Sequence, residues 1–553
     1  MPSPLSRREF VALSAAGVAA SGAAPAFAAD TWPSDAAGER EPGARSMAPR
    51  EDALFEKGVT ELAAMMARGE LTSRALVERY LQRIAAMDKQ GPAINAVIEL
   101  NPDAQAIAAA MDAERKAGKV RGPLHGIPVL IKDNIDSADQ MLTTAGSLAL
   151  ADSRPLQDAF IVQRLRAAGA VLLGKTNLSE WANYRSTRST SGWTGRGGLT
   201  RNPYVLDRNC SGSSSGTGAA LASDLATIGI GTETDGSIIS PASICGLVGI
   251  KPTLGLWSRS GIIPIAASQD TAGPMCRTVA DAAALLGALT GVDPRDGATK
   301  ASAGQARADY RSFLQAGALR GARIGVARAQ AGFNPDVDRT FDRAIAAMKD
   351  AGAVIVDPAS LPTPPQLGPA ETLVLDYEFK AGLNAYLASR GPTVAVKSLA
   401  ELIAWNEREA AREMPWFGQE IFIRAQKSGA LTAKKYLDAR ATCLRLTRAQ
   451  GIDAVMAKHR LDAIILPSNQ PAWTTDLLNG DHFTGGDTTY AAVSGYPSIT
   501  VPMGMVHGLP VGVSFIGRAW EEGRLLSYAF AFEQSTKARR APAFRATLGD
   551  GGD

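Results

Sequence analysis

Residues 229–241 read GIGTETDGSIISP and directly follow the apolar run Leu225–Ile228. Gly231, Gly236 and Ser237 predict a tight turn that leaves this run, in which several backbone N–H groups point at one spot near the Ser237 hydroxyl. That geometry is what an oxyanion hole needs. Because most Gly/Ser turns of this kind are only turns, a purely structural turn remains the alternative for this segment alone.

A second serine-rich segment lies upstream, at residues 209–218, and reads NCSGSSSGTG. Its residues 212–216 formally fit the G-x-S-x-G nucleophile elbow, which requires a strand directly before it and a later acid and histidine. The preceding residues 201–208 are polar and rich in turn formers, so the strand is missing. The later histidines lie in charged or loop-like surroundings that favour surface positions: His459, His482 and His507. The elbow interpretation therefore fails.

A third segment, residues 124–134, reads LHGIPVLIKDN and places Lys132 at the end of a strongly apolar strand. A lone lysine at a strand end is normally a solvated cap. If this strand forces Lys132 inside the protein, desolvation of the ammonium lowers its pKa by up to several units. A lysine base requires such burial, because a lysine with a pKa near 10.4 is neutral in only about one of a few thousand molecules at pH 7.

Short apolar runs recur along the chain and predict buried strands. They lie at Ile127–Ile131, Ala170–Leu173, Leu225–Ile230, Ile324–Val326, Val354–Val356, Ala463–Leu466, Ile499–Val501 and Val511–Ile516. Helical spacing of apolar residues separates several of them, as in Ala159–Ala168, and precedes them between about Thr60 and Met111. Strands alternating with helices indicate an α/β fold, in which a mixed sheet is covered by helices on both faces.

The segment from about residue 372 to 457 contains no strand-like run. It reads as helices with many charges and includes Trp405, Trp416 and Phe417. We interpret it as a helical insertion into the sheet domain. Such an insertion forms either one wall of a substrate cleft or a purely structural cap, and the sequence leaves both open.

The N-terminus reads as an export signal. Arg7 and Arg8 precede an apolar run that is too short to span a bilayer and ends at the small-x-small cleavage site Ala26-Phe27-Ala28. The twin arginine indicates the Tat route and a periplasmic or secreted protein; a basic N-terminus before an Ala-rich helix is the alternative. We expect a signal peptide over 1–28, a linker over 29–54, one domain over 55–545 and a tail over 546–553.

Composition narrows the class of protein. The 553 residues are 45% hydrophobic and 20% charged, with a net charge of +3, which is typical of a globular chain and calls for neither nucleic acid nor a membrane as partner. The four cysteines match no zinc-binding spacing, and we expect them to be small buried hydrophobic residues: Cys210, Cys245, Cys276 and Cys443. We therefore expect no metal and no cofactor.

The three segments together resemble the amidase signature family. The shared motifs are G-I-P-x-x-x-K-D-N at 126–134, the glycine-serine run, G-T-x-x-x-G-S-I at 231–238 and C-G-x-x-G-x-K-P-T at 245–253. Their order and intervals are more specific than any one of them. The resemblance extends from about residue 55 to 545, includes Gly174–Asn177 and Ser268–Pro274, and is greatest to bacterial peptide amidases. It implies a single large amidase domain.

The resemblance also implies the functional residues. The family's catalytic lysine falls on Lys132, its bridging serine, preceded by a cis peptide bond, on Ser213, and its nucleophile on Ser237. Ser213 would then pass the Ser237 proton to neutral Lys132. The oxyanion would be held by backbone N–H groups of the turn that ends at the nucleophile: Thr234, Asp235, Gly236 and Ser237.

One departure from the family pattern concerns substrate choice. Many members have G-G-S-I-R around the nucleophile, where this chain has Asp235-Gly236-Ser237-Ile238-Ile239. The catalytic positions are unaffected. The changed neighbours agree with the peptide amidase subgroup and weaken any transfer of substrate from fatty-acid or aryl amidases.

These observations predict a hydrolase of peptide C-terminal amides that acts through an acyl-enzyme. The rival enzyme hypotheses are an amidase for aryl, acyl or cyclic amides and a tRNA amidotransferase subunit, which an export signal disfavours. From another class, an exported solute-binding protein would have two similar lobes, whereas the Gly/Ser segments here crowd into residues 125–255. The expected partner is a small-molecule or peptide amide.

Overall fold

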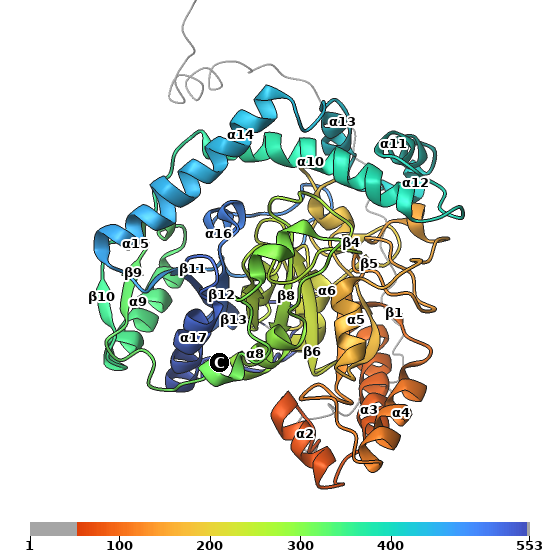
Figure 1. The fold of residues 1–553 in the computed structure, drawn as a ribbon, viewed down its shortest axis with the longest axis horizontal. Coiled ribbons are helices and arrows are strands. Elements are labelled where there is room, and N and C mark those ends of the chain that lie inside the picture. The colour runs from red at the N-terminus through yellow and green to blue at the C-terminus, as the bar shows by residue number, and fades with distance from the viewer. Residues whose placement is uncertain (1–51, 550–553) are drawn as a thin grey trace, which may run out of the picture. The chain divides into compact units, whose positions relative to one another are not determined.

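A mixed sheet of eleven strands runs through residues 52–549, the part of the chain that this computed structural model describes (Figure 1). In order across the sheet, its strands are β1 Val97–Leu100, β3 Val171–Thr176, β2 Pro128–Lys132, β6 Ile228–Glu233, β8 Thr271–Cys276, β7 Val248–Lys251, β12 Ser498–Val506, β13 Leu509–Ile516, β11 Ala463–Pro467, β9 Arg323–Val326 and β10 Val354–Val356. The expected signal peptide, most of the linker and residues 550–553 of the tail lie outside the described residues.

Both strand directions occur in this sheet. β2 is parallel to β3 and β6, and β9 is parallel to β10 and β11, whereas β6, β8, β7, β12 and β13 pair antiparallel. With the helices that flank it, this sheet confirms the predicted fold class. Each of the eight apolar runs contributes a strand. β1, β7 and β8 were not predicted, because they are short or interrupted by glycine, proline and charge.

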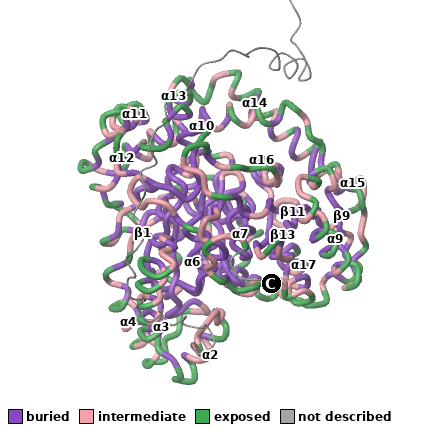
Figure 2. The backbone as a smooth tube through the Cα atoms, turned by 180° about the vertical axis from the view of Figure 1, so that it is seen from behind, coloured by how far each residue is buried: buried purple, intermediate pink, exposed green. Residues whose placement is uncertain are grey.

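Helices precede, separate and follow the strands. They are α2 Val59–Ala67, α3 Ser73–Arg83, α4 Ala104–Lys116, α5 Phe160–Ala167, α6 Ser215–Ala222, α7 Ile239–Ile244, α8 Val279–Ala288, α9 Pro335–Asp350, α10 Leu367–Ser389, α11 Leu399–Arg408, α12 Ala410–Glu413, α13 Glu420–Gln426, α14 Lys434–Leu444, α15 Asp453–His459, α16 Thr489–Ser494 and α17 Glu522–Thr536. All residues of α6 are buried, whereas in α14 only Ala439 and Cys443 are (Figure 2).

Helices α10 to α15 form the region in which the sequence predicted a helical insertion. It contains helices joined by loops and no strand, and its first helix begins at Leu367 rather than near residue 372. A buried arginine ties it to the sheet: the Arg185 guanidinium lies 2.7 Å from the Glu180 carboxylate and donates to the carbonyls of Phe417 and Gly418 at 3.0 Å. An apolar cluster that includes Trp181 and Phe422 surrounds this contact.

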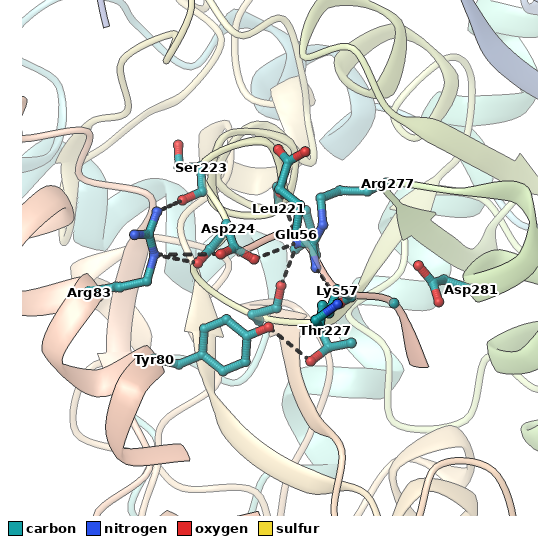
Figure 3. Close-up of polar contacts among 12 residues, drawn as sticks. Glu56, Lys57, Tyr80, Arg83, Leu221, Ser223, Asp224, Thr227, Arg277 and Asp281 are labelled. Carbon is teal, nitrogen blue, oxygen red and sulfur yellow. Dashed lines mark hydrogen bonds and ion pairs between the residues drawn. The ribbon is translucent and has the colours of Figure 1, made fainter. Parts of the chain in front are cut away.

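A second ion network fixes the beginning of β6, the strand that leads to the Ser237 turn (Figure 3). The fully buried Asp224 carboxylate lies 3.4 Å from Nη1 of Arg277 and 3.7 Å from Nε of Arg83. Arg277 also donates to the Ala226 carbonyl at 2.8 Å. Because Arg83 ends α3 and Arg277 follows β8, the network joins three distant segments at the point where β6 starts.

Candidate active site

The turn that carries Ser237 follows β6 and spans Thr234–Ser237. Gly231 lies inside β6 rather than in the turn, which corrects the prediction. A side chain there would collide with the serine run, because a Cβ would lie 2.7 Å from Ser214 Oγ. Gly236 does sit in the turn, at φ +79, in the left-handed region that favours glycine. A carboxylate then turns the chain into α7: Glu233 Oε2 accepts the N–H groups of residues 238 and 239 at 2.8 and 2.9 Å.

The turn leaves backbone N–H groups without an acceptor: within residues 52–549, those of Asp235, Gly236 and Ser237 meet none. The Asp235 side chain points elsewhere and accepts the hydroxyls of Thr488 and Thr489 at 2.5 and 2.7 Å. Burial raises the pKa of Asp235. The hydrogen bonds of the Asp235 carboxylate with these two threonines therefore fix the turn, and its free N–H groups remain available to an oxyanion.

Lys132 is the last residue of β2 and has no exposed surface. β3 and β6 pair with β2 on either side, so the whole strand is buried. Lys132 Nζ lies 2.7 Å from Ser213 Oγ, 2.9 Å from Thr232 Oγ1 and 3.3 Å from the Thr232 carbonyl. Burial lowers the pKa of Lys132 from its ordinary 10.5 to about 7, although Glu233 and Asp270 oppose the shift. Lys132 therefore has the burial that the sequence argument required.

The serine run brings Ser213 between Lys132 and the Ser237 turn. The Gly212–Ser213 peptide bond is cis, as the family resemblance implies. The neighbouring serines bond to the backbone: Ser214 Oγ donates to the Thr232 carbonyl at 3.1 Å, and Ser215 Oγ to the Ser211 carbonyl at 2.6 Å. Their hydroxyls are therefore engaged in holding the scaffold.

Ser237 is adjacent to the serine run through the backbone. The Ser214 N–H donates to the Ser237 carbonyl at 3.2 Å, and Ser237 is 8% exposed. Across the described chain, no hydrogen bond joins the Ser213 and Ser237 hydroxyls. Hydrogen bonds of catalytic groups are often long without substrate and shorten when it binds. The structure thus brings together all three residues that the sequence singled out.

A cavity of about 200 Å³ opens beside Ser213. Residues 262–265 form its apolar wall, and Asn134, Thr232, Thr234 and Asp270 add polar groups to its lining. Arg259, Arg295 and Asp296 also line it. Residues 259–265 form no strand or helix in the sequence pattern, so only the family motif at 268–274 pointed near this cavity.

None of the four histidines lines this cavity. His459 is half-buried and His482 and His507 are exposed, while His125 is buried with its Nε2 2.9 Å from the Met111 carbonyl. Cys210, Cys245, Cys276 and Cys443 are buried free thiols, as expected. Among residues 52–549, no helix is both long and apolar enough to cross a membrane.

Comparisons with known proteins show which family this sequence and fold resemble. A family model described as Amidase matches residues 75–526. The probable amidase At4g34880 of Arabidopsis thaliana is 40% identical over 502 residues, covering 89% of this chain and 92% of that protein. The native peptide amidase of Stenotrophomonas maltophilia is 50% identical, with a TM-score of 0.85 and coverage of 89% and 99%. The peptide amidase PAM, solved with the competitive inhibitor chymostatin, is 51% identical, with a TM-score of 0.86 and coverage of 88% and 99%.

The fold and these similar proteins define the class of protein as an amidohydrolase that acts on amides. More specifically, the chain belongs to the Amidase family, whose signature motifs the sequence carries.

Proposed function

We propose that this amidohydrolase removes the amide group from peptide C-termini, with Ser237 as nucleophile, Ser213 as proton relay and Lys132 as base. The burial of Lys132 beside Ser213 carries the proposal, because at a pKa of about 7 much of the lysine is neutral near pH 7. The substrate is supported by the 51% identity to the peptide amidase PAM and by the D-G-S-I-I sequence around Ser237.

The hydrogen bonds of Lys132 supply a direction for the proton. A neutral amine has two N–H donors and one lone pair. Both acceptors on Thr232, Oγ1 and the carbonyl, take the two donors. The lone pair then faces Ser213, whose hydroxyl donates to it at 2.7 Å and is free to accept a proton from Ser237.

The reaction then proceeds in two halves. Ser237 Oγ attacks the carboxamide carbon as its proton passes through Ser213 to Lys132, and the N–H groups of Asp235 to Ser237 hold the oxyanion. The C–N bond breaks, and the proton on Lys132 returns through Ser213 to the departing nitrogen, which leaves as ammonia. A water molecule repeats the sequence on the acyl-enzyme and releases the free carboxylate and Ser237.

Two measurements test this proposal. A fluorophosphonate probe should label the wild-type protein and not the Ser237→Ala variant; labelling that survives the substitution would sink the nucleophile assignment. Ammonia release should be fastest from peptide amides in a panel that also holds aliphatic amides and anilides. If no peptide amide releases ammonia, the proposed substrate is rejected. The nucleophile assignment is then tested by fluorophosphonate labelling alone.

We also propose that the protein is exported by the Tat route, on the twin arginine and the cleavage site at 26–28. The mature form should begin near Ala29 by N-terminal sequencing of a periplasmic fraction. Replacement of Arg7 and Arg8 by lysine should keep the uncleaved protein in the cytoplasm, whereas lysine substitutions at the distant Arg320 and Arg339 should not. Unchanged export of the double lysine variant would refute the route.

A further inference from the structure

The segment between the cavity wall and β8, residues 265–270, contacts both the Ser237 turn and helix α10. It begins at the end of the apolar wall and continues into β8, which pairs with β6. It also reaches the helical region: the Ser268 N–H donates to Glu378 of α10 at 2.8 Å, and Gln269 Nε2 donates to Glu371 of α10 at 2.9 Å.

Asp270 is the centre of these contacts. One carboxylate oxygen accepts the Thr234 hydroxyl at 2.6 Å. The other accepts the N–H groups of Ile265 and Ala266, both at 2.9 Å. Thr234 is the first residue of the Ser237 turn, and Ile265 is the last residue of the apolar cavity wall. A single buried carboxylate thus joins the turn to the wall.

We propose that Asp270 is a positioning residue, which sets the oxyanion turn against the cavity wall through its hydrogen bond with Thr234. The inference rests on the proposed function of the turn and goes beyond it, since Asp270 itself touches no reacting atom. Its consequence is that a substrate group held by the wall and a carbonyl held by the turn keep a fixed separation. Small displacements of such groups cost about 100-fold in rate.

The charge of Asp270 adds a second, separable effect, because Asp270 directly precedes β8, and β8 pairs with β6 at Thr232, the residue that holds Lys132 Nζ at 2.9 Å. Asp270 and Glu233 both raise the pKa of the buried Lys132 against the effect of desolvation. Burial raises the pKa of Asp270 itself to about 6, while Arg259 and the Thr234 hydroxyl oppose that rise. Above about pH 6 the carboxylate is therefore charged and holds protons on Lys132. Removal of this charge should let Lys132 lose its proton at lower pH.

The hydrogen bond is tested by two substitutions at one position. Thr234→Val removes the hydroxyl and keeps the shape, so kcat should fall about 10- to 100-fold with KM changed much less. Thr234→Ser restores the hydroxyl and should recover most of the lost kcat. Wild-type kcat in Thr234→Val, or an equal loss in both variants, would overturn the proposal.

The charge is tested by Asp270→Asn, in which one amide N–H replaces an acceptor. Its kcat should fall, and the acid limb of its pH profile of kcat/KM should move to lower pH. In Thr234→Val the acid limb should have the same midpoint as in the wild-type protein. Asp309→Asn at the surface is the matched control and should change neither. Wild-type kcat in Asp270→Asn would overturn the proposal, and if that variant does not fold, the two Thr234 variants decide.

Failure of this inference is distinguishable from failure of the proposed function. The rates are measured on whichever amide the wild-type protein hydrolyses fastest, so the identity of the substrate does not enter. The labelling rate with the fluorophosphonate is measured in parallel and should fall in Thr234→Val, because the turn also holds the phosphonyl oxygen. If the wild-type protein is labelled and hydrolyses the amide, and Thr234→Val does both at the wild-type rate, the proposed function stands and only the positioning role of Asp270 is rejected.

Discussion

Replacement of Lys132 by arginine separates the charge of this residue from its ability to act as a base. Arginine keeps a cation and several N–H donors, but its guanidinium does not lose a proton in proteins. Burial brings the pKa of Lys132 from 10.5 to about 7. At pH 7 the neutral fraction thereby rises from about one molecule in 3,000 to about one half, roughly 1,500-fold.

We therefore expect Lys132→Arg to lower kcat by at least about 1,000-fold, within the range assigned to general bases, and Lys132→Ala to be no less impaired. The wild-type kcat/KM should rise with pH through a midpoint near 7, because the base must be neutral. Stopped-time ammonia release from pH 5 to 9 measures both quantities, and circular dichroism controls for folding. A Lys132→Arg variant that retains a tenth of the wild-type kcat would refute the reasoning, as would a wild-type midpoint above pH 9.

Three further changes have outcomes that the structure fixes. Lys132→Met should raise the melting temperature at pH 7 and below, because it removes a buried cation. Wild-type stability should increase as pH rises from about 7 to 10.5, where the lysine of the unfolded chain binds a proton that the folded chain has lost. Lys132→Met should lack this increase, and equal pH dependence in both proteins would contradict the prediction. Gly236→Ala should lower kcat, because the added Cβ would lie 2.8 Å from Thr488 Oγ1 at a positive φ and would displace the turn. The rest of the fold should be little changed, and a wild-type kcat would show that the turn tolerates the side chain. Arg185→Met should cost about 1–3 kcal/mol in the free energy of urea unfolding, since it leaves the buried carbonyls of Phe417 and Gly418 without their donor. Burial raises the pKa of Glu180 well above its usual range, so this carboxyl group takes up a proton when its partner is lost; a cost below about 0.5 kcal/mol would show that water replaces the guanidinium.

The sequence predicted the local features of this site well. A strand rich in Val, Leu and Ile indicates its own burial, but a lysine at its end is by itself typical of a solvated cap. Lys132 became a candidate base only through its place before the two Gly/Ser segments at the family's spacing. The signature motifs placed Ser213 and Ser237 on adjacent segments. The strand at β6 was predicted to end early, because Gly231 reads as a turn residue when its neighbour across the fold, Ser214, is not known.

Contacts between distant segments were not predictable in this way. Asp270 meets Thr234 across 36 residues, and Asp235 meets Thr488 across 253. The sequence around Asp270 or Asp235 does not indicate which residue each carboxylate will bind, because hydrogen bonds of this kind depend on the order of strands in the sheet. The position of residues 262–265 in the cavity wall depends on the same strand order, which periodicity does not encode.

The ion network around Asp224 also constrains when this protein is able to fold during its synthesis. Arg83 leaves the ribosome long before Asp224, whereas Arg277 follows some fifty residues later. Until then, within the described residues, the Asp224 carboxylate has Arg79 and Arg83 as its only arginine partners, and β8, the antiparallel neighbour of β6, has not been made. A truncated chain that ends before Arg277 should therefore remain a substrate for proteases, and the amidase should acquire protection only once this later arginine has emerged.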